Sequence, residues 1–399
     1  MHTDTRLIVG EGGAHGLSHV RPIDLSTTYR TPDPVAAMSS MQGFAAGAAE
    51  AANPIYERLA NPNCREFEER MTGLEEGADS VCFASGMAAV AALVLESQSR
   101  GSHIVAVPPL YGGTYHLLAS GLLGSRVTWA AAAEVREALK PDTALVLLET
   151  PSNPLLTVTD IERLVHDAQG VPVAVDSTFA TPILQQPLRH GAEYAIHSAT
   201  KFIGGHGDAM GGVVTTRNPD TAMRLRQVRI ATGAILHPIA AHLFCRGIQT
   251  LGLRVRAQQE IARQLAVRLQ AHSEVNMVGY PGLSGRDHAV VDRQMAGPGT
   301  MITIRLDGGA QRADQFITHL RIAVPAVSLG AVDTLVQRPA SLTHQAMGEE
   351  ERGRLGIPED LIRISVGAEH LEDLWEDLRS SLEATACSGV TRVSELVPR

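Results

Sequence analysis

Short apolar runs with strand character alternate with helical segments through the first half of the chain. Strands are expected at residues 79–84, 104–107, 127–130, 144–149, 171–175 and 194–197. These runs lack period-two alternation, so both faces of their sheet should be covered by helices. The pattern predicts an α/β domain with a mainly parallel central sheet.

The pattern changes in the second half. Residues 219–272 are mostly helical, and the elements expected after them are strands at 301–306, 323–330 and 361–367 and helices near 311–320 and 371–384. This order predicts a smaller α+β layer.

We therefore expect three parts: an N-terminal arm over 1–52, an α/β domain over 53–245 and a C-terminal α+β domain over 246–395. The arm carries little periodic signal, so it should pack on something else and not fold alone. The last four residues, LVPR (396–399), resemble a protease site left from recombinant expression and are excluded from the fold prediction.

Composition narrows the function classes. The chain has 399 residues and a net charge of −9 with no basic run, which argues against a nucleic-acid or anionic-membrane partner. No apolar stretch reaches membrane-spanning length, and the N-terminus lacks a signal-peptide core. Four scattered cysteines without a CxxC pair indicate neither a zinc site nor a disulfide framework. We expect a cytoplasmic protein.

Polar residues follow two of the expected strands. Asp176 comes after the run at 171–175, and Ser198, Thr200 and Lys201 follow the run at 194–197. Ligands of open α/β sheets bind beyond the carboxyl ends of the strands. A desolvated lysine there has a lowered pKa and can form a Schiff base with an aldehyde. Pyridoxal phosphate needs such a lysine, a carboxylate for its ring nitrogen and donors for its phosphate.

This stretch resembles a known family. Asp176, the phrase Ser198-Ala-Thr-Lys201 and the phrase Gly204-Gly-His-Gly-Asp208 are similar to the cofactor segment of the Cys/Met-metabolism (transsulfuration) enzymes, and the resemblance extends over nearly the whole chain. It implies a PLP-dependent transferase fold (fold type I, aspartate-aminotransferase-like). It also implies a homotetramer built from two dimers with shared active sites, in which the N-terminal arm over 1–52 contacts the neighbouring subunit. In this family the equivalent of Lys201 is catalytic, and the equivalent of Asp176 holds the ring nitrogen.

Further residues are candidates for the phosphate. Ser85-Gly86-Met87 opens a helix after a strand, which makes an anion site possible, although many such turns carry glycine for steric reasons alone. The resemblance assigns the backbone of Gly86 and Met87 to the phosphate. Tyr56 and Arg58 would otherwise be interpreted as a surface pair. In the family, the matching pair reaches the cofactor phosphate of the neighbouring subunit, a role that suits the arginine fork.

Four residues are candidates for the ring and the substrate. Tyr111, in the phrase LYGG, matches a tyrosine that stacks on the cofactor and acts as an acid. Asn153, Ser328 and Arg363 match residues near the substrate carboxylate, for which a planar guanidinium is well suited. Taken alone, they would be interpreted as a turn tyrosine, an Asn-Pro turn, a loop serine and a buried ion pair.

Other cofactors have no support. His197 and His206 lie nine residues apart without a third ligand nearby, so structural roles are expected for both and no metal is predicted. The absence of a GxGxxG phrase removes the case for a nicotinamide cofactor.

The choice of reaction depends on a few positions. Cystathionine-handling members commonly have Glu where this chain has Val327, and the valine favours an apolar substrate tail. Methionine γ-lyases usually have Cys at Gly113 and a Lys-Asp pair where this chain has Arg229-Ile230. We expect γ-elimination on methionine or a related sulfur amino acid. The alternatives are γ-replacement on an O-acylhomoserine and a non-catalytic binding protein, which retention of Lys201 and Asp176 disfavours.

Overall fold

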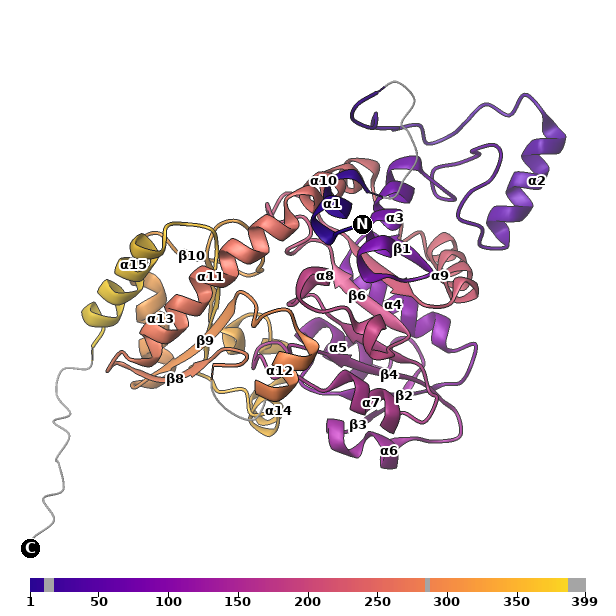
Figure 1. The fold of residues 1–399 in the computed structure, drawn as a ribbon. Coiled ribbons are helices and arrows are strands. Elements are labelled where there is room, and N and C mark those ends of the chain that lie inside the picture. The colour runs from indigo at the N-terminus through magenta and orange to yellow at the C-terminus, as the bar shows by residue number, and fades with distance from the viewer. Residues whose placement is uncertain (11–17, 284–287, 387–399) are drawn as a thin grey trace, which may run out of the picture.

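The computed structural model describes residues 1–10, 18–283 and 288–386 (Figure 1). The LVPR phrase and Cys387 lie outside the described residues.

The larger of two sheets has seven strands in the order β1-β7-β6-β5-β4-β2-β3. Neighbouring strands are parallel except β7, which runs antiparallel to both β1 and β6. The expected mainly parallel α/β sheet is confirmed. The strands are β1 (Asp79–Phe83), β2 (His103–Val107), β3 (Arg126–Trp129), β4 (Thr143–Glu149), β5 (Val173–Asp176), β6 (Tyr194–Ser198) and β7 (Gly212–Thr216).

Helices cover both faces of this sheet, as the unbroken apolar runs of its strands require. One core contains side chains of α4 (Gly86–Ser97), α5 (Gly112–Ala119) and α9 (Pro219–Thr232). On the opposite face lie α3 (Pro62–Glu75), α6 (Val135–Ala138), α7 (Ile161–Asp167), α8 (Thr181–Leu184) and α10 (Pro238–Gln249), with the short helices η1 (Ala132–Glu134) and η2 (Pro187–His190) nearby.

Local sequence explains where these helices begin. The side chain of Asn61 accepts hydrogen bonds from the backbone N–H groups of Asn63 and Cys64, and Pro62 occupies the first helical position of α3. Ser85 caps α4 in the same way, through the N–H of Ala88.

The second sheet has five strands in the order β10-β11-β12-β9-β8. It is antiparallel except for the β10–β11 pair. Its strands are β8 (Val275–Gly279), β9 (Met301–Leu306), β10 (Val324–Pro325), β11 (Leu335–Gln337) and β12 (Ile362–Ser365). The accompanying helices are α11 (Leu251–Gln270), α12 (His288–Gln294), α13 (Gly309–His319), η3 (Pro339–Ser341), η4 (Gln345–Met347), α14 (Glu349–Arg354) and α15 (Leu371–Ala384).

The long strand expected at 323–330 is wrong for most of its length. Only Val324 and Pro325 form a strand, and the chain then turns. Ser328 has a φ of 99°, a left-handed conformation that interrupts an extended strand. Strands β7, β8 and β11 were not predicted.

The N-terminal segment divides into two regions. Helix α1 (Thr3–Val9) packs on this chain's own α3 and α10 and buries Leu7. The segment carrying α2 (Pro34–Ala45) extends away from the body in Figure 1, and its end returns to α9, where Gln227 donates to the Ala45 carbonyl. Several apolar side chains of this segment are exposed, among them Val35, Met38 and Met41.

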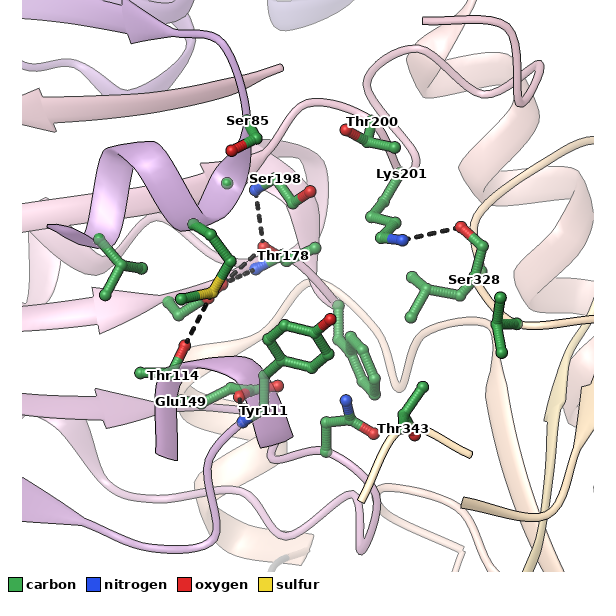
Figure 2. A pocket seen from close by; sticks show the side chains of 18 of the residues that line it. Ser85, Tyr111, Thr114, Glu149, Thr178, Ser198, Thr200, Lys201, Ser328 and Thr343 are labelled. Carbon is green, nitrogen blue, oxygen red and sulfur yellow. Dashed lines mark hydrogen bonds between the residues drawn. The ribbon is translucent and has the colours of Figure 1, made fainter. Parts of the chain in front are cut away.

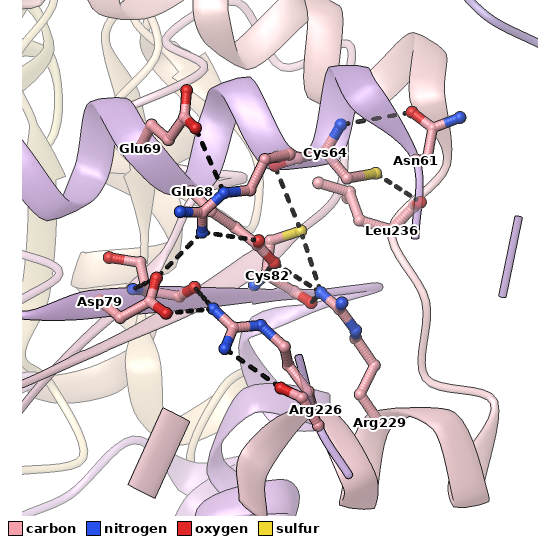
Figure 3. Close-up of polar contacts among 12 residues, drawn as sticks. Asn61, Cys64, Glu68, Glu69, Asp79, Cys82, Arg226, Arg229 and Leu236 are labelled. Carbon is pink, nitrogen blue, oxygen red and sulfur yellow. Dashed lines mark hydrogen bonds and ion pairs between the residues drawn. The ribbon is translucent and has the colours of Figure 1, made fainter. Parts of the chain in front are cut away.

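A buried charge network joins α3, β1 and α9 (Figure 3). Glu68 pairs with Arg229 at 2.6 Å, and Arg65 reaches both Glu68 at 3.6 Å and Asp79 at 3.0 Å. Arg226 pairs with Asp79 as well. We call these five residues the α3–β1–α9 charge network.

Within residues 1–10, 18–283 and 288–386, no helix is long and apolar enough to cross a membrane. The same residues contain no group of three or more His, Cys, Asp or Glu side chains that could hold a metal ion.

Candidate active site

A cavity of about 380 Å³ lies at the carboxyl ends of the parallel strands, closed on one side by loops of the second sheet. This volume is within the range of small-ligand sites. Ten of the residues singled out from the sequence line it: Gly86, Met87, Tyr111, Asn153, Asp176, Ser198, Thr200, Lys201, Ser328 and Arg363.

Lys201 projects into this cavity from the turn after β6 (Figure 2). Its Nζ donates a hydrogen bond to Ser328 Oγ at 2.7 Å. Burial, and then the charge of Arg363, lower the pKa of Lys201 from 10.5 to about 8. The chain contains one other lysine, Lys140, and that side chain is exposed. Lys201 is therefore the lysine suited to nucleophilic chemistry.

Two carboxyl groups stand side by side at the ends of neighbouring strands. Asp176 ends β5 opposite Glu149 at the end of β4. Asp176 accepts hydrogen bonds from the N–H and hydroxyl of Thr178 at 3.0 and 2.5 Å, which oppose the rise in its pKa that burial causes. Burial and the neighbouring Asp176 raise the pKa of Glu149 well above its usual range. The pair is arranged so that Asp176 retains negative charge more readily than Glu149.

Gly86, at the start of α4, and Gly212, at the start of β7, form a close approach of main chains that we call the glycine cradle. A Cβ on Gly86 would lie 2.9 Å from Ser198 Cβ, and one on Gly212 would overlap the Ser85 carbonyl. Glycine is therefore required where β1, β7 and β6 converge. Gly86 and Met87, in the first turn of α4, line the cavity together with Ser198, and the N-terminus of a helix is a common place for an anion site.

The backbone of Tyr111 is anchored by a hydrogen bond to Glu149. Its N–H donates to Glu149 Oε2 at 2.6 Å, while its ring stays 39% exposed in the cavity. A Cβ on Gly113 would lie 2.6 Å from the Tyr111 ring and 3.1 Å from Met87 Sδ. In this arrangement a larger residue at position 113 would require the Tyr111 ring or the Met87 side chain to shift.

Arg363 is a buried cation with neutral partners. One Nη donates to Asn153 Oδ1 at 2.8 Å and the other to the Ser328 carbonyl at 2.9 Å, while Nε has no hydrogen-bond partner. Burial lowers the pKa of Arg363 to about 10. Among the described residues it forms no ion pair, so it is available to an anionic ligand that enters the cavity.

Ser328 connects the two cations of the cavity. Its hydroxyl accepts from Lys201 and its carbonyl from Arg363. Its positive φ is a sparsely populated conformation for a non-glycine residue, of a kind that concentrates at functional sites.

Tyr56 and Arg58 do not reach the cavity of their own chain. Tyr56 is 43% exposed, and Arg58 lies over its ring and donates to the Ile230 carbonyl at 3.1 Å. The two histidines weighed as metal ligands have other contacts. His197 pairs with Glu75 at 2.6 Å, and His206 bonds the Gly204 carbonyl.

The sequence analysis missed several residues of the site. Glu149, Thr178, Phe179 and Thr343 line the cavity, and His344 is buried behind it. Glu149 and Thr178 carried a signal, because each is a polar residue at or just after a strand end. Phe179, Thr343 and His344 carried no such signal in the sequence.

Comparison with known proteins agrees with this geometry. Residues 8–383 match the family model described as "Cys/Met metabolism PLP-dependent enzyme". The chain belongs to this family. It is 48% identical over 393 residues to a Brevibacterium aurantiacum protein named L-methionine gamma-lyase, covering 96% of this chain and 95% of the relative. A Brevibacterium sandarakinum protein of the same name is 49% identical over 393 residues, covering 96% and 98%.

A solved structure shares the fold. The crystal structure of metB from Corynebacterium glutamicum superimposes with a TM-score of 0.89 at 34% identity and covers 97% of this chain and 99% of its own. The chain is therefore a PLP-dependent enzyme of fold type I, as the resemblance implied.

The cavity fits pyridoxal phosphate on its own chemistry. It offers one amine with a lowered pKa, the Asp176 side chain hydrogen-bonded by Thr178, and a glycine cradle at a helix N-terminus. The unpaired Arg363 remains for an amino-acid carboxylate.

Proposed function

We propose that the protein is a methionine γ-lyase, which converts L-methionine to 2-oxobutyrate, ammonia and methanethiol. The observation that carries this proposal is the 48–49% identity, over nearly the full chain, to two relatives named for that activity. Val327 and Met210 add support, because both are exposed side chains in the cavity lining that would accept an apolar thioether tail.

The residues have distinct roles in this proposal. Bound pyridoxal phosphate supplies an electron sink for the charge left when a substrate proton is removed. Lys201 Nζ would hold the cofactor and, as a neutral amine, take the α-proton. Loss of a second proton, from Cβ, then supplies the electron pair that expels the γ-sulfur, and water hydrolyses the remaining four-carbon unit to 2-oxobutyrate and ammonia. Asp176 keeps a proton on the ring nitrogen by its negative charge, and the Tyr111 phenol donates a proton to the leaving sulfur.

Binding roles fall to the remaining residues. Arg363, with Asn153 and Ser328 beside it, receives the α-carboxylate as a bidentate fork. Ser198, Thr200 and the N–H groups of Gly86 and Met87 receive the phosphate.

A second copy of the chain completes the site in this proposal. Tyr56 and Arg58 lie outside their own cavity, on a segment with exposed apolar side chains, and would reach the phosphate of a neighbouring subunit. We propose a homotetramer of two such dimers and a cytoplasmic location. We also keep the division into an arm (1–52), a cofactor domain (53–245) and a C-terminal domain (246–395).

A product assay tests the reaction. The purified holoenzyme is given L-methionine alone and, separately, O-acetyl- or O-succinylhomoserine with cysteine or sulfide. The proposal expects 2-oxobutyrate, ammonia and methanethiol from methionine alone.

The opposite pattern would replace the proposal. If methionine is not turned over but the acylhomoserine gives cystathionine or homocysteine, the protein is a γ-replacement enzyme. Gly113 and Ile230 depart from the usual γ-lyase residues, and they would then be the sequence signs that distinguish this chain from the γ-lyases.

A further inference from the structure

A segment of the second layer closes over the start of α5. It runs from η3 to η4 and places the Thr343 carbonyl against Gly112, where any Cβ would overlap it. Thr343 lines the cavity, and the next residue, His344, is fully buried behind the cavity wall.

Each nitrogen of the His344 ring has a partner. Nε2 lies 3.2 Å from the Asn153 carbonyl, and Nδ1 lies 3.0 Å from the Thr343 hydroxyl. A carbonyl only accepts hydrogen bonds, so Nε2 carries the proton and Nδ1 accepts from Thr343. Burial, followed by the charge of Arg363, lowers the pKa of His344 to about 4, so the ring is neutral at physiological pH.

The Asn153 turn joins this histidine to the cation of the cavity. Its main-chain carbonyl accepts from His344, and its side-chain oxygen accepts from Arg363 at 2.8 Å. The Leu110 carbonyl, one residue before Tyr111, also interacts with the ring. His344 thus bridges the second layer and two loops of the first.

We propose that His344 is a positioning residue for the carboxylate site: its Nε2–H fixes the Asn153 turn and thereby the Arg363 guanidinium that receives a substrate carboxylate. The inference rests on the proposed role of Arg363 but not on γ-elimination.

If the role of His344 is purely structural, a different result is expected. A buried ring that only fills space would affect stability and leave ligand affinity alone. His103 provides the matched control, because it is also fully buried and is held by two threonine hydroxyls, but it lies at the start of β2, at the opposite end of the strand from the cavity.

The test measures glycine binding to the holoenzyme by the change in visible absorbance. Glycine has an α-carboxylate but no γ-substituent, so the reading does not depend on turnover of methionine. His344→Leu should weaken glycine binding about tenfold, the effect of one lost buried hydrogen bond, and raise the KM of any turned-over substrate similarly while kcat changes less than about threefold.

Two further variants sharpen the result. His344→Gln places an amide donor near the Nε2 position and should bind glycine within about threefold of the parent. His103→Leu should lower the Tm without weakening glycine binding. If His344→Leu does not fold, His344→Asn replaces it, because its shorter amide does not reach the Asn153 carbonyl and should show the same loss.

Either of two outcomes overturns the inference. Normal glycine affinity in His344→Leu, even with a lowered Tm, makes the residue structural only. Equal losses in His344→Gln and His344→Leu show that the Nε2–H donor is not the cause. A protein that binds glycine as predicted but leaves methionine intact would contradict the proposed reaction and keep this inference.

Discussion

The molecule buries charge in two regions and handles it in opposite ways. In the α3–β1–α9 charge network, each arginine faces a carboxylate: Glu68 has Arg229 at 2.6 Å, and Asp79 has Arg65 at 3.0 Å (Figure 3). In the cavity, Lys201 faces the Ser328 hydroxyl (Figure 2), and Arg363 faces the Ser328 carbonyl and the Asn153 amide.

The pKa shifts record the difference. Burial alone would raise the pKa of Glu68, but Arg229 and Arg226 hold it below its usual range, and Glu68 helps to hold the pKa of Arg229 above its own. In the cavity, burial prevails over the partners, lowering the pKa of Lys201 to about 8 and that of Arg363 to about 10. Removing one partner of a matched buried ion pair destabilises a fold, because the other charge is left uncompensated, whereas buried cations with neutral partners mark the place of an anionic ligand.

The largest expected effect comes from removing the cavity amine. Lys201→Ala should abolish turnover and the visible absorbance of the bound cofactor, because no second lysine lines the cavity. Lys140→Ala, at the exposed lysine, is the control and should behave as the parent. Borohydride reduction of the holoenzyme followed by peptide mapping should place the cofactor on Lys201. Labelling of Lys140 instead would refute the assignment.

Breaking an ion pair of the α3–β1–α9 charge network should lower the stability of the fold and leave substrate binding unchanged. Glu68→Gln keeps the side-chain shape but leaves Arg229 buried without its carboxylate, which should lower the stability of the fold by about 3 kcal/mol. Thermal and urea unfolding measure the loss. The KM for substrate should change less than about twofold, and a large KM change at unaltered stability would erase the distinction between the two regions.

The cavity arginine should show the reverse behaviour. Arg363→Lys keeps the charge but loses the fork that contacts Asn153 and Ser328. We expect glycine binding and the KM to weaken about 100-fold, with the Tm nearly unchanged. A variant that binds normally but unfolds early would place Arg363 among the structural charges.

The cavity lysine also predicts a pH dependence. Only its neutral amine reacts with the cofactor aldehyde, and a pKa of about 8 makes that form scarce at pH 7 and dominant at pH 9. The rate at which cofactor-free protein captures pyridoxal phosphate should rise roughly tenfold over this interval and then level off. A rise that continues to the ordinary lysine value of 10.5 would mean that Lys201 is not desolvated.

The smallest effect is expected at the second cavity carboxyl. Burial and Asp176 favour the protonated form of Glu149, so Glu149→Gln replaces one neutral acceptor with another. Stability should change by less than about 1 kcal/mol, and kcat/KM by a few-fold. The same substitution at Glu68 is the matched comparison. Equal losses at both positions would show that Glu149 is charged and paired like the network.

Much of the fold could be predicted from local pattern. The parallel strands are mainly apolar runs, Asp176 is the last residue of β5, and Lys201 lies in the turn after β6, so period and position were sufficient for these two residues. Strand β7 was not predicted, and one of its two pairings is remote: in the pairing with β1, Ser80 and Thr215 are 135 residues apart. The contacts of the carboxylate site are equally remote. Asn153 and Arg363 are 210 residues apart, and His344 reaches Asn153 across 191, so no local signal indicates them.

The antiparallel strand β7 also constrains the order of events during folding. It joins the strand before the α4 loop to the strand before Lys201, through the Phe83–Gly212 and Ser198–Gly212 pairs. The pairing with β1 is the long-range one, and contacts of long sequence separation form slowly. The glycine cradle and the Lys201 amine come together only once β7 has paired with both of its neighbouring strands. Pyridoxal phosphate therefore cannot nucleate the chain's collapse. Capture of the cofactor instead requires the complete seven-stranded sheet. During refolding, the visible absorbance of the bound cofactor should therefore return after the other signals of folding.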